Sequence, residues 1–234
     1  MTRFAVAAFY LAIVTGVRGN VADVIARSDQ FIIVIADDKN SSSGTLETCE
    51  RRPSGWACDG FSGLVSLGRR GGAWGAGLHQ QPAIKREGDL RSPLGVFELE
   101  KIYGRDPAPP SAHFPYQRLT DTTVGVDDAR SRYYNRIIDV AHFAARDWRS
   151  SEQLSPSRYR WLINVKHNWE QRPGLGSNIY LHATGRGGGT HGCTAMEPET
   201  LDHIVRWLDE RKHPLLVQLT RSDYDRLRVA WGLP

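Results

Sequence analysis

The chain has 234 residues, of which 40% are hydrophobic and 24% are charged, and its formal net charge is +4. This composition excludes a disordered or collagen-like chain and is sufficient for one sizeable core. The positive charges are scattered along the chain, so we attribute the basic balance to solubility and expect no nucleic-acid partner.

The first segment of the chain, residues 1–19, is typical of a secretory signal peptide. Arg3 supplies a positive start, residues 4–17 form an uncharged and mostly apolar run, and Val17-Arg18-Gly19 offers a cleavage site. The apolar run is shorter than the roughly 20 residues that cross a bilayer. We therefore expect an exported protein with no stable membrane insertion after cleavage, the alternative being an uncleaved anchor. Residues 20–234 show no composition break and predict one domain.

The pattern of the following segments is mainly β. Alternating or β-branched runs predict strands at residues 31–35, 61–67, 95–100, 161–165, 178–182 and 215–219. Glycine, serine and proline predict turns or loops at residues 41–44, 68–77, 107–115 and 173–176. The apolar spacing over residues 136–148 is compatible with a helix. A clearer helix is expected from Glu197-Pro198, because Leu201, Ile204, Val205 and Leu208 form one apolar face.

Three cysteines are present, and their spacing separates them into a pair and a single residue. Cys49 and Cys58 lie nine residues apart, and in an oxidising compartment we expect them to form a disulfide, the alternative being two unpaired thiols. Cys193 is then left over. Such a cysteine in an exported chain is either free and reactive or bridged to another molecule.

The segment before Cys193 carries the residues that thiol chemistry needs. A predicted strand ends at His182, a glycine-rich loop follows, and the chain then runs Thr190-His191-Gly192-Cys193. Because a thiol attacks as its thiolate, it needs a base nearby, and a hairpin would bring His182 within reach. On an extended segment His191 shares a face with Cys193, and Gly192 keeps backbone N–H groups accessible to an oxyanion.

Three other interpretations of this segment remain open. His182 and Cys193 could ligate zinc with His191 or His203, although the spacing fits no common zinc pattern. Cys193 could be a buried core residue, and the glycine loop could bind a phosphate, although it lacks the Gly-Lys-Ser/Thr ending of such loops. We expect no metal and no cofactor.

Together these motifs resemble the L,D-transpeptidase catalytic domain family, often called YkuD-like. Its signature is an upstream histidine, a variable loop and Ser/Thr-His-Gly-Cys, which the run ending at Cys193 matches. Residues 85–97 resemble a second family motif, and residues 74–78, 126–128, 134–136 and 176–182 resemble landmarks of one subgroup. The resemblance covers residues of about 31–219. It implies a β-sandwich-like fold with a helix after the catalytic cysteine.

The resemblance also implies roles for individual residues. Cys193 would be the nucleophile, His182 its base, and a backbone carbonyl near Ala183 would orient that base. His191 would line the site, and the N–H groups of Gly192 and Cys193 would hold the oxyanion. The partners would be peptidoglycan stem peptides, which places the protein in the periplasm or at the cell wall; the sequence predicts no oligomeric state.

Further contacts to the substrate are expected from polar residues around the site. The candidates are Arg186, Ser177, Asn168 and Thr190, while Lys85, Glu87 and Asp89 are expected to shape a turn beside the site. Arg186 is considered because the chain after the cysteine, Thr194-Ala195-Met196, departs from the common family pattern, so a carboxylate contact has to come from elsewhere. The loop between His182 and Cys193 is also shorter than in many relatives, which predicts a more open site.

Three functions are compatible with these features. The first is a transpeptidase that forms a cysteine thioester with a stem tetrapeptide and then forms a cross-link or exchanges the terminal residue. The second is an L,D-carboxypeptidase, or a hydrolase that releases a wall-linked peptide or protein. The third is a wall-binding module without catalytic activity.

Overall fold

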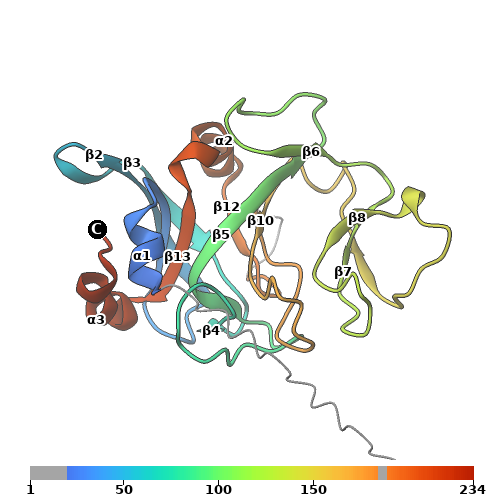
Figure 1. Cartoon of the computed structure of the whole chain (residues 1–234), viewed down its shortest axis with the longest axis horizontal. Helices are drawn as coiled ribbons and strands as arrows, with labels where there is room; N and C mark the ends of the chain where they lie inside the picture. Colours follow the sequence, from blue (N-terminus) through green and yellow to red (C-terminus); the bar gives the residue numbers. More distant parts are fainter. Residues whose placement is uncertain (1–19, 184–188) are drawn as a thin grey trace, which may run out of the picture.

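The computed structural model describes residues 20–183 and 189–234. The expected signal peptide and Arg186 therefore lie outside the described residues. Figure 1 shows one large curved sheet with helices packed against it and a smaller sheet to one side. The strands are β1 Gln30–Ala36, β2 Ser43–Arg52, β3 Gly55–Ser66, β4 Gly72–Trp74, β5 Ser92–Gly104, β6 Tyr116–Arg118, β7 Thr123–Val126, β8 Ile137–Asp139, β9 Ser151–Gln153, β10 Trp161–Val165, β11 Tyr180–Ala183, β12 Thr194–Met196 and β13 Leu215–Thr220. The α-helices are α1 Val21–Ala26, α2 Pro198–Trp207 and α3 Arg221–Trp231, and the short 3-10 helices are η1 Val140–His142 and η2 Glu210–Lys212.

The large sheet closes on itself. Its strands follow the order β10-β11-β12-β3-β2-β1-β13-β5, and β5 pairs again with β10. Most neighbours are antiparallel, while β1 with β13 and β11 with β12 are parallel. Closure pairs the strand edges that an open sheet would expose. The result confirms the expected mainly β, sandwich-like fold, here with a closed sheet, and the six predicted strands lie wholly or mostly within observed ones.

Strand β1 is buried on both faces, which explains its continuous apolar sequence. Ile32 and Val34 belong to the hydrophobic cluster that α2 also joins. Phe31, Ile33 and Ile35 belong to a second cluster that includes residues of α1 and α3. Because successive side chains of a strand point to opposite faces, one short strand contributes to both cores.

Helix α2 begins where the sequence predicts, shortly after Cys193. Glu197 is its N-cap residue and Pro198 its first helical residue, a position where the missing proline N–H costs nothing. Leu201, Ile204 and Val205 are buried in the first core cluster. The helix thus fixes the end of the segment that carries the cysteine.

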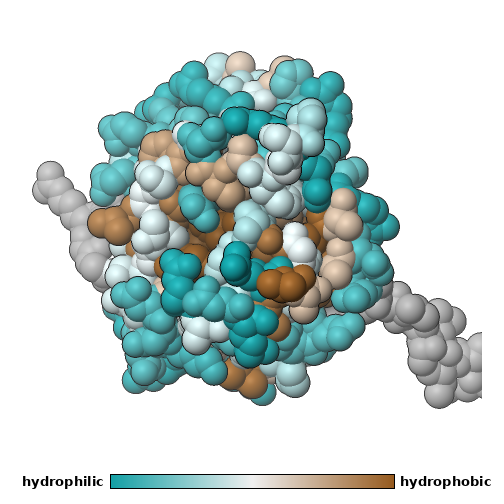
Figure 2. All heavy atoms as spheres, turned by 90° about the vertical axis from the view of Figure 1, so that its left-hand side faces the viewer, coloured by the Kyte–Doolittle hydropathy of each residue, from teal (hydrophilic) through white to brown (hydrophobic). Residues whose placement is uncertain are grey.

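The sequence patterns do not predict helices α1 and α3 or strand β2. Helix α3 is strongly polar, and only a narrow stripe that includes Tyr224, Leu227 and Trp231 is buried. Its start is fixed by Thr220, whose side chain accepts a hydrogen bond from the backbone N–H of Asp223. The side of the molecule that carries α1, α3 and the β2–β3 hairpin is hydrophilic around its rim and has hydrophobic residues near its centre (Figure 2).

The helix with which the apolar spacing over residues 136–148 is compatible does not form. This segment instead forms β8, the single turn η1 and loop. Strand β8 pairs with β7 in a small three-stranded sheet, with Ile138 opposite Val124. The Asp139 side chain accepts hydrogen bonds from the Thr122 hydroxyl and from the backbone N–H of Ala141. These local bonds and the strand pairing satisfy backbone groups that a helix would have used.

The cysteine pairing agrees with the expectation. Cys49 in β2 and Cys58 in β3 form a disulfide, and Cys193 is a free cysteine. Within residues 20–183 and 189–234, no helix has both the length and the apolar character needed to cross a membrane.

Candidate active site

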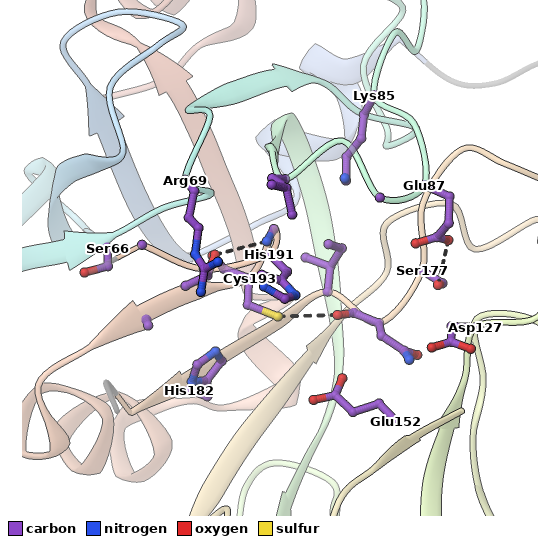
Figure 3. Close-up of a pocket in the computed structure, with 18 of the residues that line it drawn as sticks. Ser66, Arg69, Lys85, Glu87, Asp127, Glu152, Ser177, His182, His191 and Cys193 are labelled. Carbon is purple, nitrogen blue, oxygen red and sulfur yellow. Dashed lines mark hydrogen bonds between the residues drawn. The ribbon is translucent and has the colours of Figure 1, made fainter. Parts of the chain in front are cut away.

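A cleft of about 780 Å³ lies where β11, the segment before β12 and the loop before β5 meet. The small sheet supplies a further wall through Asp127 and Glu152. Figure 3 shows Cys193 and His182 in this cleft, with Lys85 and Glu87 reaching in from the loop before β5.

Cys193 is half-buried at the base of the cleft. The backbone N–H of Tyr180 donates to its sulfur over 3.4 Å, and its thiol donates to the carbonyl oxygen of Asn178 over 3.4 Å. Burial raises the pKa of the thiol to about 12, and the nearby Glu152 carboxylate acts in the same direction. The thiol is therefore protonated at neutral pH, and it needs a base at the moment when it attacks.

His182 lies on β11, next to the segment that carries the cysteine, because Leu181 of β11 pairs with Thr194 of β12. Its Nδ1 atom is 2.7 Å from the carbonyl oxygen of Ala183, so Nδ1 carries the proton and donates it. Nε2 is then the atom that can accept a proton. Burial, more than any other influence, lowers the pKa of the ring below its ordinary value. The imidazole is therefore neutral at pH 7, as a base must be, and Tyr159 packs edge-on against it with ring centroids 5.7 Å apart.

The turn before the cysteine is held by side-chain hydroxyls. Thr190 Oγ1 donates to the carbonyl oxygen of Cys193 over 2.6 Å and accepts from the N–H of Gly192 over 3.1 Å. Ser92 Oγ donates to the same carbonyl over 3.2 Å. Gly192 has a φ of +150°, and a Cβ there would lie 3.0 Å from the carbonyl oxygen of Arg91. The turn thus needs glycine at this position both for its backbone conformation and for its space.

This arrangement changes the expected oxyanion hole. The N–H of Gly192 already donates to Thr190 and is not free to bind an oxyanion. Among the described residues the N–H of Cys193 has no hydrogen-bond acceptor, which leaves it available to the cleft. The geometry thus offers the Cys193 N–H as a donor and uses the Gly192 N–H for the turn.

The comparisons with known proteins bear directly on this site. A model of the L,D-transpeptidase catalytic domain, the YkuD family, matches residues 27–217, which is most of the chain. The chain belongs to this family. No match was found among curated proteins or among solved structures.

YkuD proteins are cysteine-dependent enzymes, and here the cysteine of the family motif opens into the cleft. Cys193 is therefore not the buried core residue that the sequence alone leaves possible. His191 also lines this YkuD cleft and is exposed, as expected for a residue on the same side as the cysteine.

The structure places only some of the expected substrate-binding residues at the cleft. Thr190 and Ser177 line the cleft, although the Thr190 hydroxyl is engaged within the turn. Asn168 does not line it. Its side-chain amide donates to the carbonyl oxygens of Arg172 and Gly176, and its oxygen accepts from the N–H of Arg172. Asn168 therefore holds the neighbouring loop, and the expectation that it contacts the substrate is not supported. Arg186 lies outside the described residues.

Several cleft residues are not among the site residues that the sequence predicts. Glu152 accepts a hydrogen bond from the Tyr159 hydroxyl over 2.9 Å and lies 3.4 Å from the Arg158 guanidinium. Burial raises the pKa of this carboxyl. Asp127 and Arg69 also line the cleft. They lie far from Cys193 in the chain, and only the folding of the small sheet brings Asp127 and Glu152 to the cleft.

Proposed function

We propose that the chain is a peptidoglycan L,D-transpeptidase that forms a thioester with a stem tetrapeptide through Cys193. The observation that carries the proposal is that the protonated thiol of Cys193 and the neutral ring of His182, whose Nδ1 is anchored on a carbonyl, line the same cleft. Such a pair can transfer one proton from sulfur to Nε2 as the sulfur attacks.

The first step is acylation. The Cys193 sulfur bonds to the carbonyl carbon of the L-centre of the third stem residue, and the thiol proton passes to His182 Nε2. The Ala183 carbonyl accepts from Nδ1 and stabilises the imidazolium that forms. The N–H of Cys193 donates to the oxyanion. When the tetrahedral intermediate collapses, the terminal D-amino acid leaves, and its amine takes the proton from His182.

The second step resolves the thioester. An amine attacks the acyl carbon, His182 takes a proton from that amine, and the proton returns to the sulfur as the thiol leaves. An amine from a second stem gives a cross-link, and a free amino acid exchanges the terminal residue. Water in the same position would give a shortened stem or release a wall-linked peptide or protein. The location that follows is the periplasm or the cell wall, where stem peptides lie, in keeping with the signal-like residues 1–19.

Incubation with defined muropeptides and analysis of the products by mass spectrometry tests the proposal. We expect dimers, or exchanged monomers when a D-amino acid is added, and none from Cys193→Ala. Shortened monomers without dimers or exchange would replace the transferase by the hydrolase. Identical products from wild type and Cys193→Ala would overturn the proposed nucleophile.

A further inference from the structure

A lysine is buried beside the turn that presents Cys193. The side chain of Lys85 is only 3% exposed, although its residue lines the cleft. Its Nζ is 2.8 Å from Asp89 Oδ1 and 3.3 Å from the carbonyl oxygen of Arg86. Taking an ammonium group out of water is unfavourable unless pairing and hydrogen bonds offset the loss of hydration, so its position needs a physical account.

The ammonium group occupies space that two glycines leave open. A Cβ on Gly192 would lie 3.6 Å from Lys85 Nζ, and a Cβ on Gly176 would lie 3.5 Å from it. Both glycines have positive φ values, +150° and +99°. The charge is therefore directly behind the backbone that leads into Cys193, and Figure 3 shows the lysine pointing from its loop toward this region.

The partner of Lys85 is held by other groups as well. The Asp89 carboxylate also accepts from the backbone N–H groups of Arg86, over 2.7 Å, and Arg91, over 2.9 Å. Although desolvation opposes the shift, these N–H groups and the lysine together lower the pKa of Asp89 below its ordinary value. The Asp89 carboxylate thus accepts from three donors, and Lys85 is only one of them. It therefore neutralises the charge of Lys85 only in part, and the remaining positive potential acts on the Gly192 turn.

We propose that Lys85 is a positioning residue for catalysis, whose buried charge stabilises the anion that forms at Cys193 through the Gly192 turn. The inference rests on the proposed role of Cys193 as nucleophile. An opposite charge nearby favours the ionised form of a thiol, and a fixed charge in a desolvated site acts more strongly than one in water. The same field favours the oxyanion of the tetrahedral intermediate.

The charge matters to the thiol because the two largest influences on its pKa disfavour the thiolate. Burial and Glu152 both raise the pKa of Cys193, while the Tyr180 N–H and the charges of Lys85 and Arg158 lower it. Arg158 is exposed and is drawn toward Glu152, whereas Lys85 is shielded from solvent. Among the described cations that line the cleft, Arg69 is also exposed, so Lys85 is the one whose effect is least screened.

Alkylation of Cys193 by iodoacetamide tests this without any peptide substrate. In Lys85→Met, which keeps the length of the side chain, we expect the second-order rate constant to fall about threefold to tenfold at each pH tested from about 7 to 9. The thiolate fraction falls about tenfold for one pKa unit, and the greater nucleophilicity of a more basic thiolate offsets part of this. Lys85→Arg should keep most of the wild-type rate. Lys166→Met is the matched control, because Lys166 also pairs with a carboxylate, Glu98, but lies outside the cleft.

Asp89→Asn separates an electrostatic role from a structural one. If Lys85 acts by its charge, removing the negative partner leaves the alkylation rate unchanged or raises it. If the pair only shapes the loop, Asp89→Asn slows alkylation as much as Lys85→Met does, and the proposal is overturned. A folded Lys85→Met that is alkylated at the wild-type rate also overturns it. Should Lys85→Met fail to fold, Asp89→Asn alone decides by the same criterion.

The test is independent of the proposed transpeptidase reaction. A wild-type protein that is alkylated at Cys193 but yields no muropeptide product would contradict the proposed function and leave the inference on Lys85 standing. If Lys85→Met instead raises only the KM for stem peptides, with unchanged alkylation, Lys85 binds a substrate carboxylate and the electrostatic role is excluded.

Discussion

The Nδ1 atom of His182 lies 2.7 Å from the carbonyl oxygen of the next residue, Ala183. This single contact decides which nitrogen of the ring faces the cleft as a base. A main-chain acceptor cannot ionise, so it orients the ring without adding a second titrating group. The burial that lowers the pKa of His182 then keeps the ring neutral at pH 7.

His182→Gln is expected to reduce kcat/KM for stem peptides by about 10²- to 10⁴-fold, because the thiol loses its base. Far-UV circular dichroism should remain that of the wild type. His142→Gln, at an exposed position outside the cleft, is the matched control and should retain wild-type rates. A His182 variant with more than about half of the wild-type rate would contradict the assignment of the base.

Thr190→Val removes the hydroxyl that bridges Gly192 and Cys193 while keeping the shape of the side chain. We expect the free energy of unfolding to fall by about 1–3 kcal/mol, since buried polar groups lose a partner. The rate of acylation should fall about tenfold, because the cysteine turn is no longer fixed. Thr190→Ser keeps the hydroxyl and should restore both quantities. Equal loss in the serine and valine variants would show that the methyl group, and not the hydroxyl, matters.

Asn168→Ala should affect stability and leave substrate binding unchanged. Its amide bonds hold the loop that contains Arg172 and Gly176, so we expect the free energy of unfolding to fall by about 1–3 kcal/mol. The KM of the folded fraction should stay within about twofold of the wild-type value. Ser177→Ala, which changes a residue that lines the cleft, is the comparison. A large KM increase in Asn168→Ala, but not in Ser177→Ala, would show that Asn168 contacts the substrate after all.

His167 makes the free energy of unfolding depend on pH in the acidic range. Its burial lowers its pKa to about 3, and the neutral ring donates to Leu175 and accepts from the N–H of Ala76. In the unfolded chain it titrates near 6.5, so below that pH the unfolded state binds the extra proton. The stabilisation is fully present above about pH 6.5 and is lost as the pH falls toward 3.

Thermal unfolding followed from about pH 7 to pH 4 tests this dependence. We expect His167→Gln to have a lower Tm than the wild type at neutral pH and a Tm that falls less steeply with acid. Parallel curves for the two proteins would show that His167 does not contribute. His142→Gln should follow the wild-type slope, because its side chain is exposed.

Most of the closed sheet and the position of the cysteine site could be predicted from the sequence, because strong local signals mark them. Strand β1 is a continuous apolar run, and α2 has both a proline at its start and one apolar face. Helix α3 gave a weak signal, because its exposed surface is charged and its buried stripe is narrow. The segment 136–148 shows a helical spacing of apolar residues, but pairing with β7 overrides it.

Some site residues could likewise be predicted from the sequence, and others could not. Cys193 and His182 lie within one motif and could be identified from spacing. Glu152 lies in β9 and Asp127 directly follows β7, and tertiary packing brings both to the cleft. Residues 126–128 resemble a family landmark, but no local pattern predicts that Asp127 or Glu152 lines the site. Asn168 is the opposite case. Its place near a turn predicts a substrate contact, whereas its side-chain hydrogen bonds among the described residues all go to the neighbouring loop.

The most direct test of the central claim is the intact mass of the enzyme quenched in acid during turnover of a stem tetrapeptide. We predict a mass increase equal to the tripeptide acyl group, located on Cys193 by peptide mapping and lost on treatment with hydroxylamine, as a thioester requires. His182→Gln should accumulate this adduct far more slowly, and Cys193→Ala should not form it. Product formation with no adduct on wild type, or an adduct that persists in Cys193→Ala, would contradict Cys193 as the nucleophile.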